Sequence, residues 1–190
     1  MDTLISVLLG IGLAAACGFR IFVPFLLVGI AARTGHVALG PSFSWMAGTP
    51  ALIALGVATI VEVGAYFIPW LDHVLDLVAT PAAVCAGMVM TASVVTGLDP
   101  LLKWTLALIA GGGIAGTVQA LTVGTRKVSL LTTGGLANPA VAAVELIGSV
   151  LLTLLSIALP LLAFAVIAWA LFFGVRYLLR QVRGLGQGAA

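Results

Sequence analysis

The chain has 190 residues, of which 62% are hydrophobic and only 7% are charged, and its formal net charge is +2. A soluble domain carries roughly 25% charged residues, so this chain could not cover a water-exposed surface. Binding to nucleic acid is not expected either, because that function needs a basic stripe exposed to water. The composition therefore predicts a membrane protein that has the lipid bilayer as its main partner.

Apolar stretches long enough to cross a hydrocarbon core about 30 Å thick recur along the chain. In lipid the backbone must satisfy its own hydrogen bonds, so these stretches should be helices. We expect an all-α fold, a polytopic transmembrane helical bundle of about six spans in a single domain over residues 1–190, with a short flexible tail at 185–190. The expected apolar segments are residues 3–32, 50–68, 81–96, 100–123, 139–159 and 160–179.

The first apolar segment is too long for one ordinary crossing. A straight helix of about 30 residues extends about 45 Å, against a core of about 30 Å. The segment also contains Gly18, Arg20 and Pro24. It either tilts strongly and protrudes, or breaks near residues 18–24 into two half-helices of a re-entrant segment, and the sequence leaves both alternatives open.

Four junctions pair a capping side chain with proline, which is typical of helix starts. They are Thr49-Pro50, Thr80-Pro81, Asp99-Pro100 and Asn138-Pro139. The first and the last each follow an arginine, Arg33 or Arg126, and a glycine-containing loop. This similarity suggests an inverted repeat of three plus three helices, with halves at 1–97 and 98–184, which is a common transporter plan. A chance coincidence of Gly and Pro spacing is the alternative.

Basic residues predict the orientation, because cytoplasmic loops carry an excess of Lys and Arg. With six spans and a cytoplasmic N-terminus, the outer side receives Arg33 and Lys103, and the inner side receives Arg126, Lys127, Arg176, Arg180 and Arg183. We therefore expect a multi-pass protein of the cell (inner) membrane with both termini in the cytoplasm.

Ionisable residues inside a membrane are costly and mark functional sites by default. The candidates are Arg20, Glu62 and Glu145. Both glutamates are expected about 10 Å from the inner ends of their helices, so neighbouring helices would place them in one cavity. Two carboxylates in a low dielectric could bind a proton or a cation. In the alternative, a neighbouring helix or Arg20 satisfies each carboxylate.

Further polar candidates are expected at the inner side of the bundle. Asp72 and Asp76 share a helix face, with His73 between them in sequence. These groups could bind a divalent cation, or they could simply form a wet interfacial turn. The helix start at Asn138 and the guanidinium of Arg126 could contact an anionic group. No cofactor is expected, and the sequence supplies no third or fourth ligand that would fix a metal.

Several segments resemble one known family. They are Gly18-Phe19-Arg20 with Phe22-Val23-Pro24, then Ile68-Pro69-Trp70-Leu71-Asp72-His73-Val74-Leu75-Asp76, and finally Gly124-Thr125-Arg126 with Asn138-Pro139 and Glu145. Together they resemble the bacterial and plant membrane-protein family catalogued as domain of unknown function 4126, over nearly the whole chain. The chain departs from that pattern at Tyr66-Phe67 and Leu146, where the family is expected to carry charged residues. The resemblance implies a membrane protein and highlights the same polar residues, but it implies no activity.

These observations lead to three functional hypotheses. The first is a small transporter or channel-like permease for an ion or small solute, acting as a homo-oligomer in which a second copy helps to enclose the path. The alternative is a non-transporting scaffold, subunit or lipid-binding protein whose polar groups are satisfied internally. The third is a metal-dependent membrane enzyme that uses residues 72–76. Because no Ser/His/Asp triad or HExxH motif can be assembled, we do not expect an enzyme.

Overall fold

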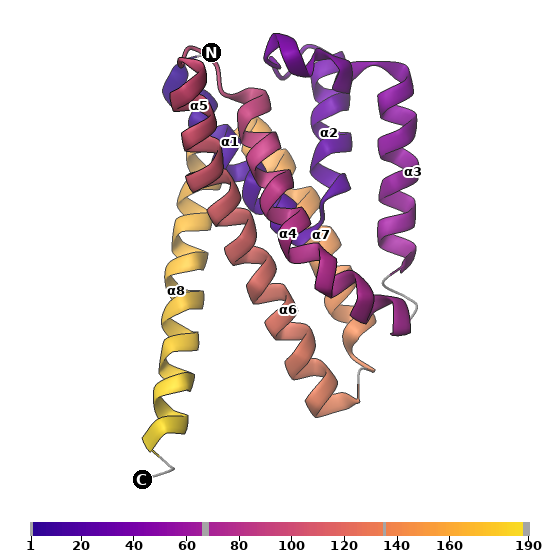
Figure 1. The fold of residues 1–190 in the computed structure, drawn as a ribbon, viewed down its shortest axis with the longest axis vertical. Helices are drawn as coiled ribbons and strands as arrows, with labels where there is room; N and C mark the ends of the chain where they lie inside the picture. Colours follow the sequence, from indigo (N-terminus) through magenta and orange to yellow (C-terminus); the bar gives the residue numbers. More distant parts are fainter. Residues whose placement is uncertain (1, 66–68, 135, 188–190) are drawn as a thin grey trace.

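A computed structural model describes residues 2–65, 69–134 and 136–187, with the backbone alone described at 69–77, 175 and 177–187. The described chain is all-α (Figure 1). Its elements are α1 (Thr3–Phe19), α2 (Phe22–Arg33), the 3-10 helix η1 (Pro41–Ala47), α3 (Thr49–Ala65), α4 (Pro69–Val94), α5 (Pro100–Leu106), the π-helical turn η2 (Ala107–Gly112), α6 (Gly113–Thr133), α7 (Asn138–Ala158) and α8 (Pro160–Gln187).

Helix α1 is the centre of the bundle and packs against α4, α6, α7 and α8. Its residues from Leu9 to Gly18 are all buried. Small residues make this possible, because they let neighbouring backbones approach closely. A Cβ atom added at Gly18 would lie only 2.6 Å from the carbonyl oxygen of Ala115 on α6. The apolar core therefore forms around a helix that most of the other elements surround.

The first apolar segment breaks into two half-helices, which decides between the two alternatives left open by the sequence. α1 ends at Phe19, Arg20 is extended with φ −146° and ψ 131°, and α2 begins at Phe22. Figure 1 shows α1 descending from one end of the bundle to mid-height and α2 returning to the same end. The segment is therefore a hairpin of two half-helices, and not one straight helix.

Two helices of the described chain are long and apolar enough to cross a membrane. They are the continuous helix Pro100–Thr133, with 34 residues, and Asn138–Ala158, with 21. The pair Pro41–Ala47 and Thr49–Ala65, bent by 67°, adds a third if it counts as one span. Four shorter apolar helices are Thr3–Phe19, Phe22–Arg33, Val78–Val94 and Pro160–Gly174. The apolar helices support a membrane protein, whereas six spans arranged as an inverted repeat are not confirmed.

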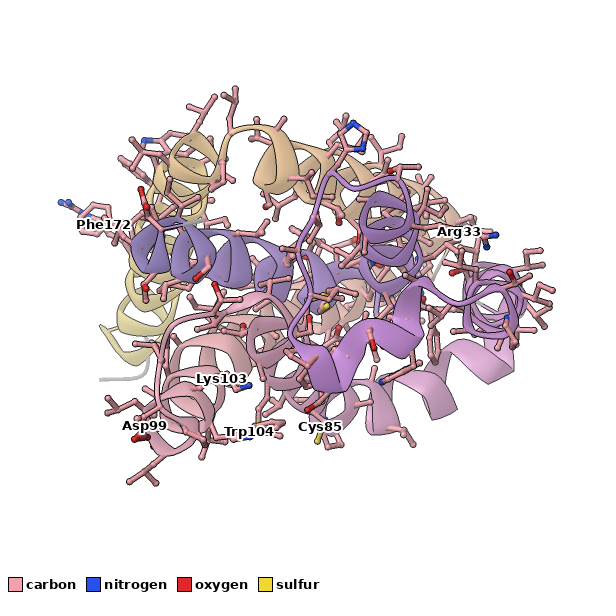
Figure 2. The ribbon with its side chains drawn as sticks, turned by 90° about the horizontal axis from the view of Figure 1, so that it is seen from above. Arg33, Cys85, Asp99, Lys103, Trp104 and Phe172 are labelled. Atoms are coloured by element: carbon pink, nitrogen blue, oxygen red, sulfur yellow. The ribbon has the colours of Figure 1, made fainter. Side chains whose placement is uncertain are left out.

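The hairpin changes the relation between the two ends of the chain. In Figure 1, α1 begins at the upper end of the bundle and α8 finishes at the lower end. The expectation of both termini on one side counted residues 3–32 as a full crossing, whereas the chain turns back at Arg20. The side on which each terminus lies therefore stays a prediction. Seen from above, Arg33, Asp99 and Phe172 lie at the outer edge of the bundle (Figure 2).

The proline junctions behave in different ways. Asp99 caps α5 as expected, with its Oδ1 accepting from the backbone N–H groups of Leu101 (2.8 Å) and Leu102 (3.2 Å). Thr80-Pro81 does not start a helix, because α4 runs continuously through Pro81. Proline is tolerated there since neighbouring helices in a membrane bundle can satisfy the freed backbone groups.

The other two junctions lie at helix starts. α3 begins at Thr49, and the Oγ1 of Thr49 accepts from Nη1 of Arg33 at 2.9 Å. α7 begins at Asn138, so that Ala137 stands at its N-cap position. Both helix starts were therefore predicted to within one residue, and capping by the side chains of Thr49 and Asn138 stays a prediction.

Candidate functional site

The site is built around the break between α1 and α2. Proline lacks a backbone N–H, and its ring clashes with the carbonyl group four residues earlier in a helix. Pro24 therefore disfavours a helix through Arg20, the residue four positions before it. Within the first turn of α2, the same proline is tolerated. The local sequence thus breaks the helix where the chain carries a charged residue.

Glu62 of α3 holds the start of the second half-helix. Its Oε1 accepts from the backbone N–H of Ile21 at 2.7 Å, and its Oε2 accepts from the backbone N–H of Phe22 at 3.0 Å. The first amides of a helix have no partner within the helix, and the positive end of its dipole favours an anion. Glu62 therefore satisfies two backbone groups that the break leaves open.

A second carboxylate joins the other side of the break to α6 and α7. Arg126 donates from Nε to Oε1 of Glu145 at 3.1 Å and also from Nη2 to Oε2. Nη2 of Arg20 lies 3.4 Å from the same Oε2 and donates to the backbone oxygen of Ala142 at 3.0 Å. All three charged side chains are buried. Glu145 is therefore shared by two guanidinium groups inside an apolar bundle.

The two glutamates do not share a cavity, contrary to the expectation. Glu62 lines a cavity of about 740 Å³ between α2, α3 and α4. Glu145 lines a smaller cavity of about 350 Å³ between α6 and α7. α2 packs against both α3 and α7, so the hairpin lies between the two carboxylates. Helical depth alone could not have predicted this separation.

Most of the remaining sequence candidates fall where side chains are not described. Asp72, His73 and Asp76 belong to the backbone of α4, but their side chains lie outside the described residues, so a metal site there is untested. Asn138 is the first residue of α7, and its Oδ1 is buried. Among the described side chains, no group of three His, Cys, Asp or Glu residues could hold a metal ion.

The charged residues of the site, Arg20, Glu62, Arg126 and Glu145, were each predicted from the sequence. The backbone groups that connect them were not predicted. The amides of Ile21 and Phe22 and the carbonyl of Ala142 are as much part of the site as the charges. The available signal was Pro24, four residues after Arg20 in an apolar segment, because it marks the place where backbone amides become free.

A further groove continues from the Glu145 cavity along the bundle. It has a volume of about 410 Å³ and lies between α1, α6, α7 and α8. Both cavities are lined by Phe19, Thr122 and Thr125. Apart from Glu145 and threonine hydroxyls, their described linings are apolar. The charged cluster is thus flanked by cavities whose walls suit hydrocarbon.

Comparison with known proteins agrees with the sequence motifs. The family described as Domain of unknown function (DUF4126) matches residues 7–180. The chain belongs to this family. The resemblance inferred from the GFR, DH-containing and GTR…NP…E segments is therefore confirmed. No curated protein matches the chain, and no solved structure matches it. DUF4126 brings no established activity, so function has to be argued from the site.

Proposed function

We propose that the protein is a small membrane permease for an ion or small solute, with its site at the break between α1 and α2. The observation that carries this proposal is a helix interrupted inside an apolar bundle, with charged side chains of other helices on both sides of the break. Extended backbone at membrane depth is tolerated where it is buried in protein or lines a cavity. Half-helix ends that face one another near the midplane are a recurring way for transporters to bind substrates and ions.

The residues of the site have separate roles in this proposal. Glu62 binds a proton or a cation while it holds the start of α2, and Glu145 balances Arg20 and Arg126. The start of α7 at Asn138 and the guanidinium of Arg126 are placed to contact an anionic group of a substrate. The protein acts as a permease and not as an enzyme.

The basic end of the bundle gives the orientation we propose. α6 and α8 both end at the lower end of the bundle in Figure 1, and the second halves of these helices carry the exposed residues Lys127 and Arg176. Because cytoplasmic segments carry the excess of Lys and Arg, we place this end and the C-terminus in the cytoplasm of the cell. The N-terminus then lies on the outer side.

A bundle this small encloses little space by itself, so we also propose a homo-oligomer. α3 packs against α2 and η1 and exposes Ile53, Ile60 and Val61. Single-molecule subunit counting of the purified protein in nanodiscs tests this part. Discs that contain only one copy under conditions of full activity would contradict it.

One observation favours a second candidate function, a non-transporting scaffold. Arg126 and Glu145 hydrogen-bond one another directly, and a buried pair of this kind can serve to fix helix packing. In that case the polar groups hold the hairpin in place, and no solute passes.

Ion flux in proteoliposomes under imposed proton and cation gradients tests the proposal. We expect protein-dependent flux in the wild type, a reduction of at least tenfold in Glu62→Gln and Glu145→Gln, and wild-type flux in Asp99→Asn, which removes an exposed carboxylate outside the site. Wild-type flux in both glutamate variants would overturn the site assignment. Flux equal to that of empty liposomes under every gradient would overturn the permease and favour the scaffold.

A further inference from the structure

The cavity between α2, α3 and α4 combines a large apolar wall with one carboxylate. Its volume of about 740 Å³ lies within the range of about 300–1,000 Å³ that is typical of pockets for small organic molecules. Glu62 is the one ionisable residue among its described lining residues. The other described lining residues are Ile21, Phe22, Ala54, Val57, Ala58, Val61, Ala65, Val78, Ala79 and Ala82. A fully polar ion would therefore find a single ligand here, whereas an apolar molecule would find an extended wall.

Glu62 differs from Glu145 in its partners. Glu145 accepts hydrogen bonds from a guanidinium and lies beside a second one. Within the described part of the chain, the bonds to Glu62 come from backbone amides, and no guanidinium or ammonium group forms an ion pair with it. A carboxylate in apolar surroundings attracts a positive charge more strongly than one in water, because the effective dielectric is lower. Arg20 and Arg126 act on Glu62 electrostatically from outside this cavity, and neither belongs to its described lining. The described wall of the cavity is therefore complementary to a cation.

The route into this cavity runs through the apolar faces of α3. This helix packs against α2 and η1, and Val57 and Val61, which line the cavity, are 56% and 64% exposed. In a bilayer such exposed faces meet hydrocarbon. A ligand that reaches Glu62 along these residues needs an apolar body, and it needs a positive charge to gain from the carboxylate.

We propose that this cavity binds an amphiphilic monocation, with its apolar body between α3 and α4 and its positive charge beside Glu62. The inference rests on the proposed function, since Glu62 belongs to both, and it names the class of cation held at Glu62. The anionic group proposed to contact Arg126 and Asn138 belongs to a separate species. An apolar body without charge gains nothing from Glu62, and an anion of the same shape is repelled by it.

Equilibrium binding of tetraphenylphosphonium to the purified full-length protein in zwitterionic nanodiscs tests the proposal. Tetraphenylborate has the same shape with the opposite charge and serves as the matched probe, and empty discs report partitioning into lipid. We expect saturable binding of the cation, at about one molecule per chain, and only lipid partitioning of the anion. Both Glu62→Gln and Ala58→Phe should weaken cation binding at least tenfold, the first by removing the charge and the second by filling the cavity.

The control variant is Ala143→Phe, which makes the same exchange at an exposed position of α7 that lines none of the cavities described above. It should bind as the wild type does. Equal binding of cation and anion, wild-type affinity in Ala58→Phe, or no binding above empty discs would each overturn the proposal. If Glu62→Gln does not fold, Ala58→Phe and the anion decide the question.

The measurement separates this inference from the proposed function, because it needs no gradient. Saturable cation binding without flux of any solute would overturn the permease and leave the binding site standing. Flux of simple ions that depends on Glu62, combined with no binding of tetraphenylphosphonium, would overturn the amphiphilic substrate and leave the permease standing.

Discussion

Glu62 links two parts of the chain that are about forty residues apart in sequence, and it does so through backbone amides. This contact explains why a carboxylate can be accommodated in an apolar helix. The orphan amides at the start of α2 need acceptors, and the carboxylate needs donors, so each group reduces the cost of burying the other.

Replacing Glu62 should therefore weaken the hairpin. We expect Glu62→Ala to lower the free energy of unfolding by about 2 kcal/mol, since removing a helix cap costs roughly 0.5–2 kcal/mol and two amides lose their acceptor here. Glu62→Gln keeps one side-chain oxygen as an acceptor and should lose less. Unfolding of both variants in mixed micelles with increasing denaturing detergent measures the difference, and wild-type stability in Glu62→Ala would contradict this account.

The pair of Arg126 and Glu145 should behave as a coupled unit. Removing one partner of a buried ion pair costs about 3–5 kcal/mol, because the other charge stays behind in low dielectric. We expect Glu145→Gln to cost more than Arg126→Gln, because Glu145 also lies beside Arg20. A double-mutant cycle on the free energy of unfolding checks this. Strictly additive effects of the two substitutions would show that the pair is not coupled.

At the scale of single residues, the sequence predicted the charges well and their partners poorly. Arg20, Glu62 and Glu145 stand out because charge is rare in these apolar segments. Arg20 pairs with Glu145, and Glu62 instead accepts from the amides at the start of α2. This choice of partners depends on which helices are neighbours. That information is tertiary, and the spacing of residues along one helix does not contain it.

The helices are held together by close contact between small residues. η2 places Gly111 against Gly87 of α4, and a Cβ at Gly87 would lie 2.6 Å from the carbonyl oxygen of Gly111. Gly111 and Gly112 therefore serve close packing, whereas a Cβ at Gly113 would meet no neighbour. The two packed glycines are the last residues of a π-helical turn. Turns of this kind often change the local direction of a helix.

Gly87→Ala should destabilise the bundle by about 1–3 kcal/mol, the usual cost of overpacking a tight core. Gly56→Ala is the matched control, because a Cβ at Gly56 in α3 meets no neighbour, and it should leave stability unchanged or slightly raised. Thermal unfolding of both variants in the same detergent provides the comparison. Equal melting temperatures of the two variants would contradict this prediction, because they would mean that α4 and η2 move apart at little cost to accommodate the added methyl group.

At the scale of helices, the effect of proline on the helix depends on its position. Asp99-Pro100 starts a helix because the aspartate can reach two free amides. Thr80-Pro81 has a similar pattern, yet the apolar helix continues through it. Pro24 was one of the residues near which the sequence predicted a possible break, and α1 and α2 separate just before it. The first two junctions have the same local pattern, so the surrounding packing decides whether the helix ends there.

For the whole molecule, the hairpin predicts that the start of α1 and η1 lie on the same side of the membrane. Both lie at the upper end of the bundle in Figure 1, whereas the loop between α6 and α7 lies at the opposite end. We expect an impermeant maleimide to label Asp2→Cys and Ser42→Cys in intact cells and Leu136→Cys only after permeabilisation.

The native Cys17 and Cys85 are replaced by alanine in each protein, so that the introduced thiol is the one that reacts. Labelling of Asp2→Cys and Ser42→Cys from opposite sides would contradict the hairpin and return the first segment to a full crossing. Reversed sides would keep the hairpin and invert the orientation assigned from the basic residues.

Composition and hydropathy predicted the class of the molecule but could not count its crossings. A segment of about 30 apolar residues has the same hydropathy whether it tilts through the bilayer or turns back within it. The turn is stabilised by Glu62, Arg126 and Glu145, all of which come from later parts of the chain. The first segment is therefore the part of the fold that its own sequence specifies least.

The same hairpin has a consequence for how the protein is made. Its two halves are synthesised first, but the groups that hold the break arrive only when α3, α6 and α7 have been translated. The first thirty residues therefore cannot reach their final position until Glu145 has been synthesised, when about three quarters of the chain has left the ribosome. Helix α1, at the centre of the finished bundle, is consequently among the last elements to reach its final position. In a ribosome-bound chain that stops before α7, Arg20 should lack its partners Glu145 and the carbonyl of Ala142.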